Sequence, residues 1–230
     1  SGRRDLTTKR MQTTRTRKRT TSVSRPDRDT HRDDIAAIGR DLKRYVWILG
    51  GLVLLLWAVE LLDLLLVGGS LDRLGIRPRT VGGLIGVPLH PLLHLGLGHV
   101  ALNSIGLLLF GGLVILRDER DFWTTVLLGT LIGGLGVWLF GRPSIHVGAS
   151  GVVFALFGYL LLTGWFDRSV GAILLSAVVF LLWGSALFGL SPMQVGISWE
   201  AHLFGFLAGG FAAWLRARRR RVKLPVKPAA

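Results

Sequence analysis

The sequence predicts an all-α integral membrane protein with six membrane-spanning helices, and three observations support this fold class. Half of the 230 residues are hydrophobic, and glycine is abundant at 31 residues. The charged residues gather in clusters that long apolar stretches separate. Six of these stretches approach the length of about 20 residues that a helix needs to cross a bilayer core.

The six expected spans follow one another with short connections, apart from a long loop after the first. They cover residues 45–67, 92–116, 122–140, 150–166, 170–190 and 199–216. Residues 1–44 are rich in Arg, Lys, Thr, Ser and Asp, and they contain too little apolar surface to fold alone. We therefore expect a disordered basic tail over 1–44, a membrane domain over 45–216 and a second basic tail over 217–230.

The net charge of +14 is concentrated outside the expected spans. Residues 1–44 carry 14 of the 28 Lys and Arg, and another 7 lie from Arg216 onward. Basic segments that flank a membrane domain favour a cytoplasmic position, which predicts both termini in the cytoplasm and an even number of spans. The lipid bilayer is thus an expected partner, whereas nucleic acid is not, because no recognition motif accompanies the charge. Cysteine is absent, which excludes disulfides and a thiol nucleophile.

In this topology the second, fourth and sixth spans begin at the outer face of the membrane, and unusual polar residues lie at those ends. They are His94, His99 and Asn103, then Ser150, then His202. At about 1.5 Å per helical residue, the last four lie roughly 21 to 27 Å above the inner boundary of a core about 30 Å thick. Polar groups at such depth are energetically expensive and commonly mark a functional site.

The pattern of small residues predicts how the fourth and sixth spans meet. His202 is followed on one helical face by Gly205, Gly209 and Ala213. The fourth span has a matching stripe of Gly151, Ala155 and Gly158 beside Ser150. Small faces let two helices approach closely, so we expect these stripes to pack together and to bring Ser150 within hydrogen-bond reach of His202. A serine beside a histidine is a nucleophile beside a general base.

Several alternatives apply to single features. Small-residue packing alone explains a glycine-flanked serine in a membrane protein more often than catalysis does. His94 and His99 are histidines, which are common metal ligands, so with Asn103 they could form a metal site. Positions five apart on a helix diverge, however, so no metal or other cofactor is expected. We expect His90 and His146 to be loop residues at the water interface.

Glu60 and Asp63 lie one turn apart in the first span, where carboxylates are unusual. They are compatible with a proton or cation relay. We favour a structural role, in which they pair with Arg77 or Arg79 of the first outer loop.

Taken together, the ordered motifs resemble those of rhomboid intramembrane serine proteases. The motifs are His94-x4-His99-x3-Asn103, then Gly148-Ala149-Ser150-Gly151, then His202-x2-Gly205-x3-Gly209, with a long first outer loop that includes Gly75-Ile76-Arg77-Pro78-Arg79. The resemblance covers about residues 45–216. It implies a six-helix bundle of the rhomboid type.

The same resemblance implies roles for individual residues. Ser150 would be the nucleophile and His202 the general base. His99, Asn103 and the backbone N–H of Ser150 would form the oxyanion hole. The expected structural residues near the site are His94, Gly148, Gly151, Phe154, Gly205 and Gly209.

The chain departs from well-studied bacterial members at two points. Phe154 stands where they have a tyrosine that packs on the catalytic histidine, so a hydroxyl is lost and the apolar contact is kept. The first outer loop lacks the Trp-Arg pair that some members carry.

The expected function is therefore that of an intramembrane serine endopeptidase in a multi-pass membrane protein, most simply of a prokaryotic plasma membrane. Its substrates would be transmembrane proteins cut near the outer face through an acyl-enzyme. The alternative is a catalytically silent rhomboid-like protein that binds transmembrane clients. A transporter or channel is disfavoured, because the inner halves of the spans are almost purely apolar.

Overall fold

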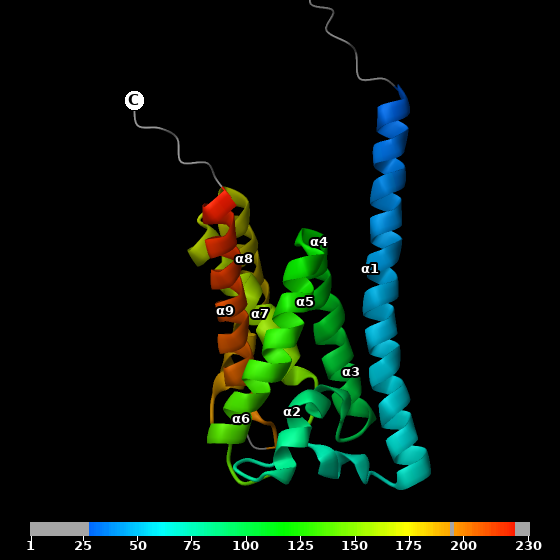
Figure 1. The fold of residues 1–230 in the computed structure, drawn as a ribbon, viewed down its shortest axis with the longest axis vertical. Helices are drawn as coiled ribbons and strands as arrows, with labels where there is room; N and C mark the ends of the chain where they lie inside the picture. Colours follow the sequence, from blue (N-terminus) through cyan, green and yellow to red (C-terminus); the bar gives the residue numbers. More distant parts are fainter. Residues whose placement is uncertain (1–27, 194–195, 224–230) are drawn as a thin grey trace, which may run out of the picture. The chain divides into compact units, whose positions relative to one another are not determined.

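The computed structural model describes residues 28–193 and 196–223 of the chain, and these residues form helices and turns without a strand (Figure 1). An isolated antiparallel bridge joins Ile76 to His146. The chain divides into two compact units, residues 1–39 and residues 40–230. Every element discussed below lies in the second unit, apart from the first turns of α1.

Five helical segments within the described residues are long and apolar enough to cross a membrane. They are Ile35–Val67, Leu97–Arg117, Glu119–Phe140, Ser150–Asp167 and Val170–Leu190. These segments agree with the first five expected spans and make the protein an integral membrane protein. The sixth expected span lies in α9 (Trp199–Lys223), which is not among the five. Glu200, His202 and Arg216 are among the polar residues that reduce its apolar character.

The first helix is longer than the sequence predicts. Helix α1 runs from Arg28 to Leu62 and continues as one π-helical turn, η1 (Asp63–Val67). Gly68 ends it in the left-handed conformation, with φ of 61°. Residues 28–44, which we expected in a disordered tail, are thus helical, whereas residues 1–27 of that tail lie outside the described residues.

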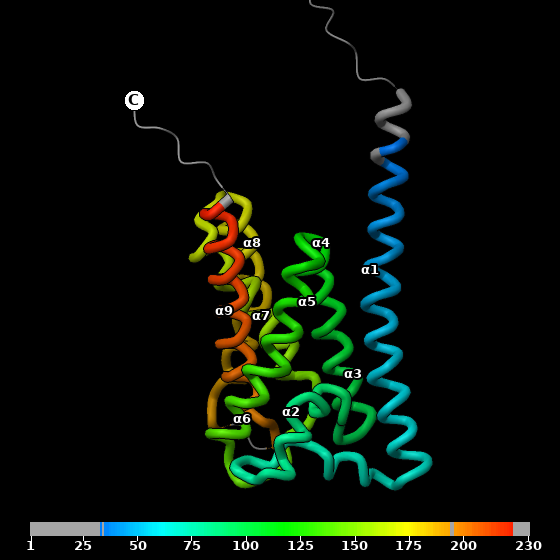
Figure 2. Tube along the Cα trace, viewed as in Figure 1, coloured from blue at the N-terminus to red at the C-terminus, as the bar shows by residue number. Residues whose placement is uncertain are grey.

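The second and third spans each combine two α-helices around a π-helical turn, and the trace shows each as one continuous rod (Figure 2). Their segments are α3 (Leu97–Gly106), η5 (Leu107–Gly111) and α4 (Gly112–Arg117), then α5 (Glu119–Leu128), η6 (Gly129–Gly133) and α6 (Gly134–Phe140). The second span begins five residues later than expected. The reason is that Gly96, with φ of 97°, and the extended Leu93 interrupt the helical backbone before Leu97.

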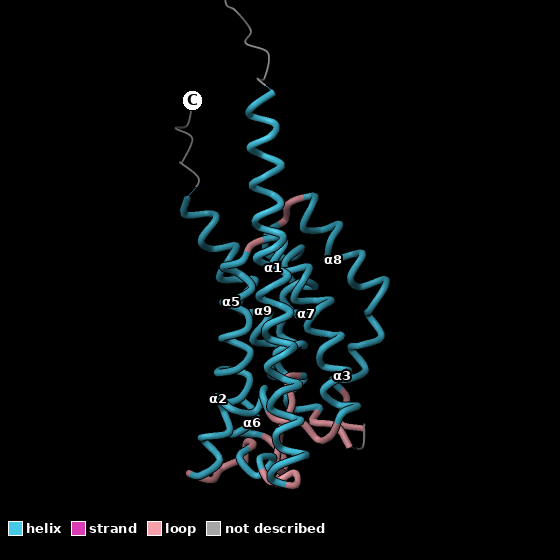
Figure 3. Tube along the Cα trace, turned by 90° about the vertical axis from the view of Figure 1, so that its right-hand side faces the viewer, coloured by secondary structure: helices cyan, strands magenta, loops and turns pink. Residues whose placement is uncertain are grey.

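The long connection after α1 is folded rather than open. It contains η2 (Leu71–Leu74), η3 (Gly82–Ile85), α2 (Gly86–Leu89) and η4 (His90–Leu92). Gly83 lies directly against the backbone of Arg77, and Gly86 lies against the backbone of Gly75, so a side chain at either glycine would clash. The longer loops gather at this end of the second unit, while two short connections lie at the opposite end (Figure 3).

Helix α7 (Ser150–Asp167) lies beside α9 and contributes many buried residues to the core. Gly205 is so close to Gly151 that an added Cβ would overlap the Gly151 carbonyl, and Gly209 faces the Ala155 carbonyl in the same way. At Gly158 the added Cβ would lie 2.5 Å from the Phe206 carbonyl oxygen. The predicted packing of the two small-residue stripes is therefore confirmed.

Helix α8 (Val170–Trp183) follows α7 after a two-residue connection and ends in the 3₁₀-helix η7 (Gly184–Leu190). Ser176 on α8 bridges back to α7, since its hydroxyl donates to the Leu160 carbonyl and accepts from the Gly164 N–H. Most of the outward side chains of α8 are apolar and exposed, as expected of a helix in contact with lipid.

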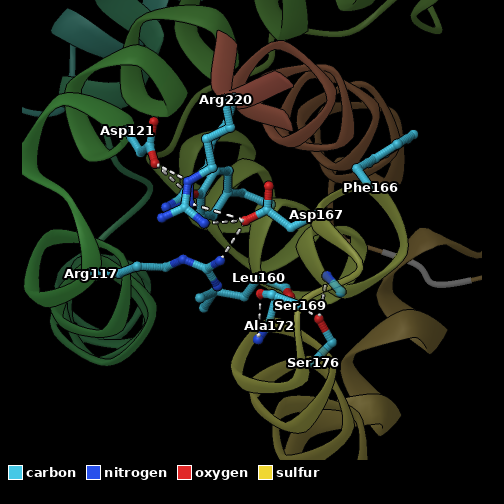
Figure 4. A network of polar contacts seen from close by, with 12 residues as sticks. Arg117, Asp121, Leu160, Phe166, Asp167, Ser169, Ala172, Ser176 and Arg220 are labelled. Carbon is cyan, nitrogen blue, oxygen red and sulfur yellow. Dashed lines mark hydrogen bonds and ion pairs between the residues drawn. The ribbon is translucent and has the colours of Figure 1, made fainter. Parts of the chain in front are cut away.

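A network of ion pairs joins four helices at what we call the charged end, where α4 meets α5 and α7 meets α8 (Figure 4). Asp167 pairs with Arg117 at 2.8 Å, Arg216 at 3.3 Å and Arg220 at 3.6 Å. Arg216 also pairs with Asp121 at 2.7 Å. These ion pairs, largely buried except at Arg220, hold the ends of α4, α5, α7 and α9 together.

Candidate active site

A cavity of about 850 Å³ lies at the opposite end, where α3, α7 and α9 begin; we call this the cavity end. His99, Asn103, Ser150 and His202 all line it, together with Phe154. The four polar residues that the sequence singled out therefore face one space, although they come from three separate helices. Residues 142, 144–147 and 196–198, which precede α7 and α9, also line it.

Ser150 is the first residue of α7, and the backbone before it sets its position. Gly148 has φ of 114°, a conformation that favours glycine. A Cβ on Gly148 would lie 2.6 Å from the ring of His99, so only glycine lets this loop pass so close to α3. The Gly148 N–H donates to the His90 carbonyl at 2.8 Å. This glycine thus sets the distance between Ser150 and the polar residues of α3.

His202 is buried on α9 and is held from two sides. Its ring stacks on Phe154 with centroids 4.0 Å apart and an interplanar angle of 8°. Its Nδ1 lies 3.0 Å from the carbonyl oxygen of Gly189 in η7, and a carbonyl only accepts, so Nδ1 carries the proton. In the neutral ring this leaves Nε2 as a proton acceptor. The sequence motifs gave no signal for Gly189, because its contribution is a backbone carbonyl.

The structure brings Ser150 and His202 to the same cavity without a direct bond between them. In the part of the chain that is described, no hydrogen bond joins the Ser150 hydroxyl to the His202 ring. Contacts between a nucleophile and its base are commonly longer without substrate and shorten in the reacting complex. Hydrogen-bond reach between these two side chains thus stays a prediction.

His99 and Asn103 share one face of α3, as their spacing predicts. The Leu95 N–H donates to Nδ1 of His99 at 3.3 Å, which leaves the proton of the neutral ring on Nε2. Asn103 uses one amide hydrogen to donate to the His99 carbonyl at 3.1 Å, and its second is free to donate elsewhere. Both side chains can therefore present an N–H to the cavity.

His94 lies beside this pair but faces the protein interior. Its Nδ1 donates to the Leu92 carbonyl at 3.3 Å, and its Nε2 accepts from the Ala149 N–H at 3.4 Å. Burial lowers its pKa to about 4, which keeps the ring neutral and suited to this double role. His94 thus ties the segment before α3 to the residue before Ser150, and its structural role stays a prediction.

The expectation for His90 and His146 was wrong, since both are buried at 2% exposure instead of lying at the water interface. His90 donates from Nδ1 to the Val87 carbonyl, and burial lowers its pKa to about 4. His146 contacts the Ser198 hydroxyl at 2.6 Å through Nδ1, and burial lowers its pKa as well. The physical reason is that the loops of this end pack on one another, which sequence periodicity does not reveal.

The pairing expected for Glu60 and Asp63 was wrong too. Arg77 donates to the Arg73 carbonyl, and Arg79 donates to the carbonyls of Leu139 and Gly141. Asp63 instead accepts from the Leu71 N–H at 2.9 Å. This contact joins Asp63 to the backbone of the turn that follows α1, and a structural role for the two carboxylates stays a prediction.

Comparison with known proteins places this chain in a family. The family model described as the Rhomboid domain matches residues 82–219, a range that contains every residue assigned to the cavity above. The chain is 39% identical to the uncharacterized protein Rv1337 of Mycobacterium tuberculosis, over 81% of this chain and 83% of that protein. It is 33% identical to the putative rhomboid protease YdcA of Bacillus subtilis, over 52% of this chain and 60% of that protein. It is also 33% identical to RHOMBOID-like protein 1 of Arabidopsis thaliana, over 54% of this chain and 33% of that protein.

Proposed function

The chain belongs to the rhomboid family, and on this premise we propose that it is an intramembrane serine endopeptidase. One observation carries the proposal: Ser150, His202, His99 and Asn103 come from three helices and line one cavity. Such convergence of a nucleophile, a base and two N–H donors is what acyl transfer requires. Packing alone gives no reason for these four polar side chains to meet.

We place α9 as the sixth span and both ends of the chain in the cytoplasm. The basic residues from Arg216 onward support this orientation. The charged end then faces the cytoplasm and the cavity end faces outward. The buried contact of α9 with α7 supports its place in the bundle, since an element so deeply packed beside a membrane helix shares its environment.

In the first chemical step, the Ser150 hydroxyl attacks a substrate carbonyl while Nε2 of His202 takes its proton. The imidazolium so formed keeps its bond from Nδ1–H to the Gly189 carbonyl, which fixes the ring orientation during proton transfer. The stacked ring of Phe154 limits rotation of the imidazole in the same way. No carboxylate is needed in this dyad, because a backbone carbonyl selects the tautomer.

The negative charge that develops on the substrate oxygen needs donors that are already oriented. Nε2–H of His99, the free amide hydrogen of Asn103 and the N–H of Ser150 are the proposed donors. The N–H of Ser150 is available because the first amides of a helix have no partner within it. The tetrahedral intermediate then collapses: the peptide C–N bond breaks, and His202 gives its proton from Nε2 to the leaving amine, which leaves the acyl-enzyme on Ser150. Water then attacks this ester, with His202 again as the base, and releases the new carboxyl end and the Ser150 hydroxyl.

The substrate would be a transmembrane protein that unwinds locally near the outer face. An intact helix engages its carbonyls in internal hydrogen bonds, so a peptide bond must leave helical structure before Ser150 can attack it. The polar groups of the cavity can hold the water needed for hydrolysis below the membrane surface.

The test uses purified full chain with a reporter transmembrane substrate in neutral detergent. We expect cleavage by the wild type and none above background by Ser150→Ala or His202→Ala. The double variant should equal the single ones, because nucleophile and base act as a unit. Ser144→Ala is the matched control, since it removes another hydroxyl from the cavity wall. Substrate capture without cleavage by the wild type would overturn the proposal in favour of a catalytically silent client binder.

A further inference from the structure

A second cavity, of about 450 Å³, lies at the charged end between the end of α7 and the last turns of α9. We call it the basic cavity. It is lined by Trp165, Phe166, Arg168, Trp214, Ala217, Arg218 and Arg221. Three guanidinium groups and two indole rings thus surround one small space, far along the helices from Ser150.

The arginines of the basic cavity lack anionic partners. In the described part of the chain, Arg168, Arg218 and Arg221 form no ion pair. Arg218 lies over the ring of Trp214 at 5.4 Å, and Arg221 donates to the Phe166 carbonyl. These contacts orient two guanidinium groups without neutralising them.

The carboxylate beside Arg168 in the sequence does not supply the missing charge. Asp167 precedes Arg168 in the sequence, but its side chain is 2% exposed and engaged by Arg117, Arg216 and Arg220 (Figure 4). The charged end therefore separates into a network of paired charges and an exposed group of three arginines, Arg168, Arg218 and Arg221, without an ion pair. Such a group favours an anion from outside the chain.

An apolar groove of about 790 Å³ adjoins the basic cavity and shares Trp165 and Arg168 with it. The groove runs between α7 and α8. Its walls are mostly apolar side chains, among them Leu161, Ile173, Ala177 and Phe180. An apolar groove that adjoins a cavity with three unpaired arginines fits a molecule with an acyl chain and an anionic headgroup.

We propose that the basic cavity and the adjoining groove form a binding site for one anionic phospholipid. The phosphodiester lies among Arg168, Arg218 and Arg221, and an acyl chain follows the groove along α7 and α8. Trp165 lies where the two parts meet and Trp214 lines the basic cavity, and tryptophan is typical of the interface between headgroups and chains. The site is separate from the catalytic cavity, so it does not depend on the proposed proteolysis.

The backbone of Arg168 gives a way to separate binding from folding. Arg168 ends α7 in the left-handed conformation, with φ of 52°, where glycine is the favoured residue. Replacing it with glycine removes the guanidinium and relieves backbone strain at once. The unfolding temperature of Arg168→Gly is thus expected to equal or exceed that of the wild type, although the variant loses affinity for the ligand.

The experiment is native mass spectrometry of the full chain in neutral detergent, titrated with dioctanoyl phosphatidylglycerol or dioctanoyl phosphatidylcholine. We expect one tightly retained phosphatidylglycerol and weaker retention of phosphatidylcholine. Arg168→Gly and Arg218→Gln should each weaken phosphatidylglycerol binding by about fivefold or more, the effect of one arginine at a charged membrane surface. Arg219→Gln is the matched control, because Arg219 is exposed on the same helix but does not line the cavity.

Three outcomes would overturn the proposal. An equal loss in Arg219→Gln would indicate diffuse attraction to the basic end of α9 instead of a site. Displacement of the lipid by inorganic phosphate at the lipid's own concentration would indicate a site for free anions. Ala177→Trp should fill the groove and weaken lipid binding, whereas Val178→Trp, exposed on α8 outside the groove, should not; equal binding by both would exclude the acyl part.

Discussion

The two ends of this helical bundle both carry buried polar residues, but they use them in opposite ways. At the charged end, Asp167 and Arg216 engage partners of opposite charge, and the interior network is closed. At the cavity end, His202 and Asn103 use one polar atom each to contact a backbone carbonyl and keep another available. The first arrangement pairs its charges within the protein, whereas the second leaves donors and acceptors directed into the cavity.

This difference separates polar residues that stabilise the fold from polar residues that remain available for chemistry. A closed network has nothing left with which to bind a substrate, so its loss should reduce stability more than turnover. An open cluster contributes less to stability, and its loss should reduce turnover more. Substitutions at the two ends test this contrast directly.

The largest effect on turnover should come from the polar residues that line the catalytic cavity. Asn103→Ala is expected to lower kcat by about 10²–10³-fold with little change in KM, because it removes a donor used mainly in the transition state. Steady-state kinetics with a reporter substrate would measure this. Ser104→Ala is the control, since it removes a buried hydroxyl from the same helix, one that donates to the Val100 carbonyl and accepts from Trp57 of α1. A rise in KM alone for Asn103→Ala would assign Asn103 to substrate docking.

A somewhat smaller loss is expected from the contact that sets the geometry of the cavity. Gly205→Ala places a Cβ against the Gly151 carbonyl, so α9 must shift away from α7. A displacement of about 1 Å can cost about 10²-fold in rate, although no reacting atom is touched. The matched control is Gly171→Ala on α8, where an added Cβ meets nothing within 4 Å. Full activity of Gly205→Ala would show that this contact does not position His202.

Much of this geometry could be predicted from the sequence, because membrane helices follow simple rules. Length and hydropathy located the five apolar segments, and helical periodicity placed His99 with Asn103. The stripe from Gly205 to Gly209 predicted contact with α7, since only small residues permit such close approach. These predictions rest on local pattern and needed no knowledge of the loops.

The remaining features depend on contacts between distant segments, which local pattern does not encode. Gly189 orients His202 through its carbonyl, and every residue has a carbonyl, so no residue type indicates this role. His90 and His146 are buried because the loops fold over one another. The early start of α1 at Arg28 was missed as well, since a charged helix has no apolar periodicity to reveal it.

At the charged end, Asp167→Asn should mainly reduce stability. Removing this buried charge leaves the surrounding arginines without their shared partner, a change that costs on the order of 3–5 kcal/mol in comparable buried pairs. The folded fraction should still cleave substrate within about threefold of the wild-type rate, because the site lies at the other end. Unfolding in mixed micelles would measure the stability, and turnover per folded molecule would measure the activity.

The control is Asp118→Asn, at an exposed helix cap, for which little change is expected. A collapse in turnover without a loss of stability would contradict the contrast.

The smallest effect concerns the buried His94, which should make stability depend on pH even though it is not a catalytic residue. Its pKa lies at about 4 in the folded protein, below the ordinary value of 6.5, because burial disfavours the imidazolium. Between these values the unfolded chain binds a proton that the folded chain does not, so stability should fall as the pH drops from 6.5 toward 4. Above pH 6.5 both states are neutral at His94, and its contribution to stability is constant.

For one such histidine, the free energy of unfolding changes by about 1.4 kcal/mol per pH unit within this range. His94→Gln should reduce the measured slope by that amount in SDS titrations between pH 4.5 and 6.5. An unchanged slope would mean that His94 is protonated in the folded state, and its bond from the Ala149 N–H would then have to be abandoned.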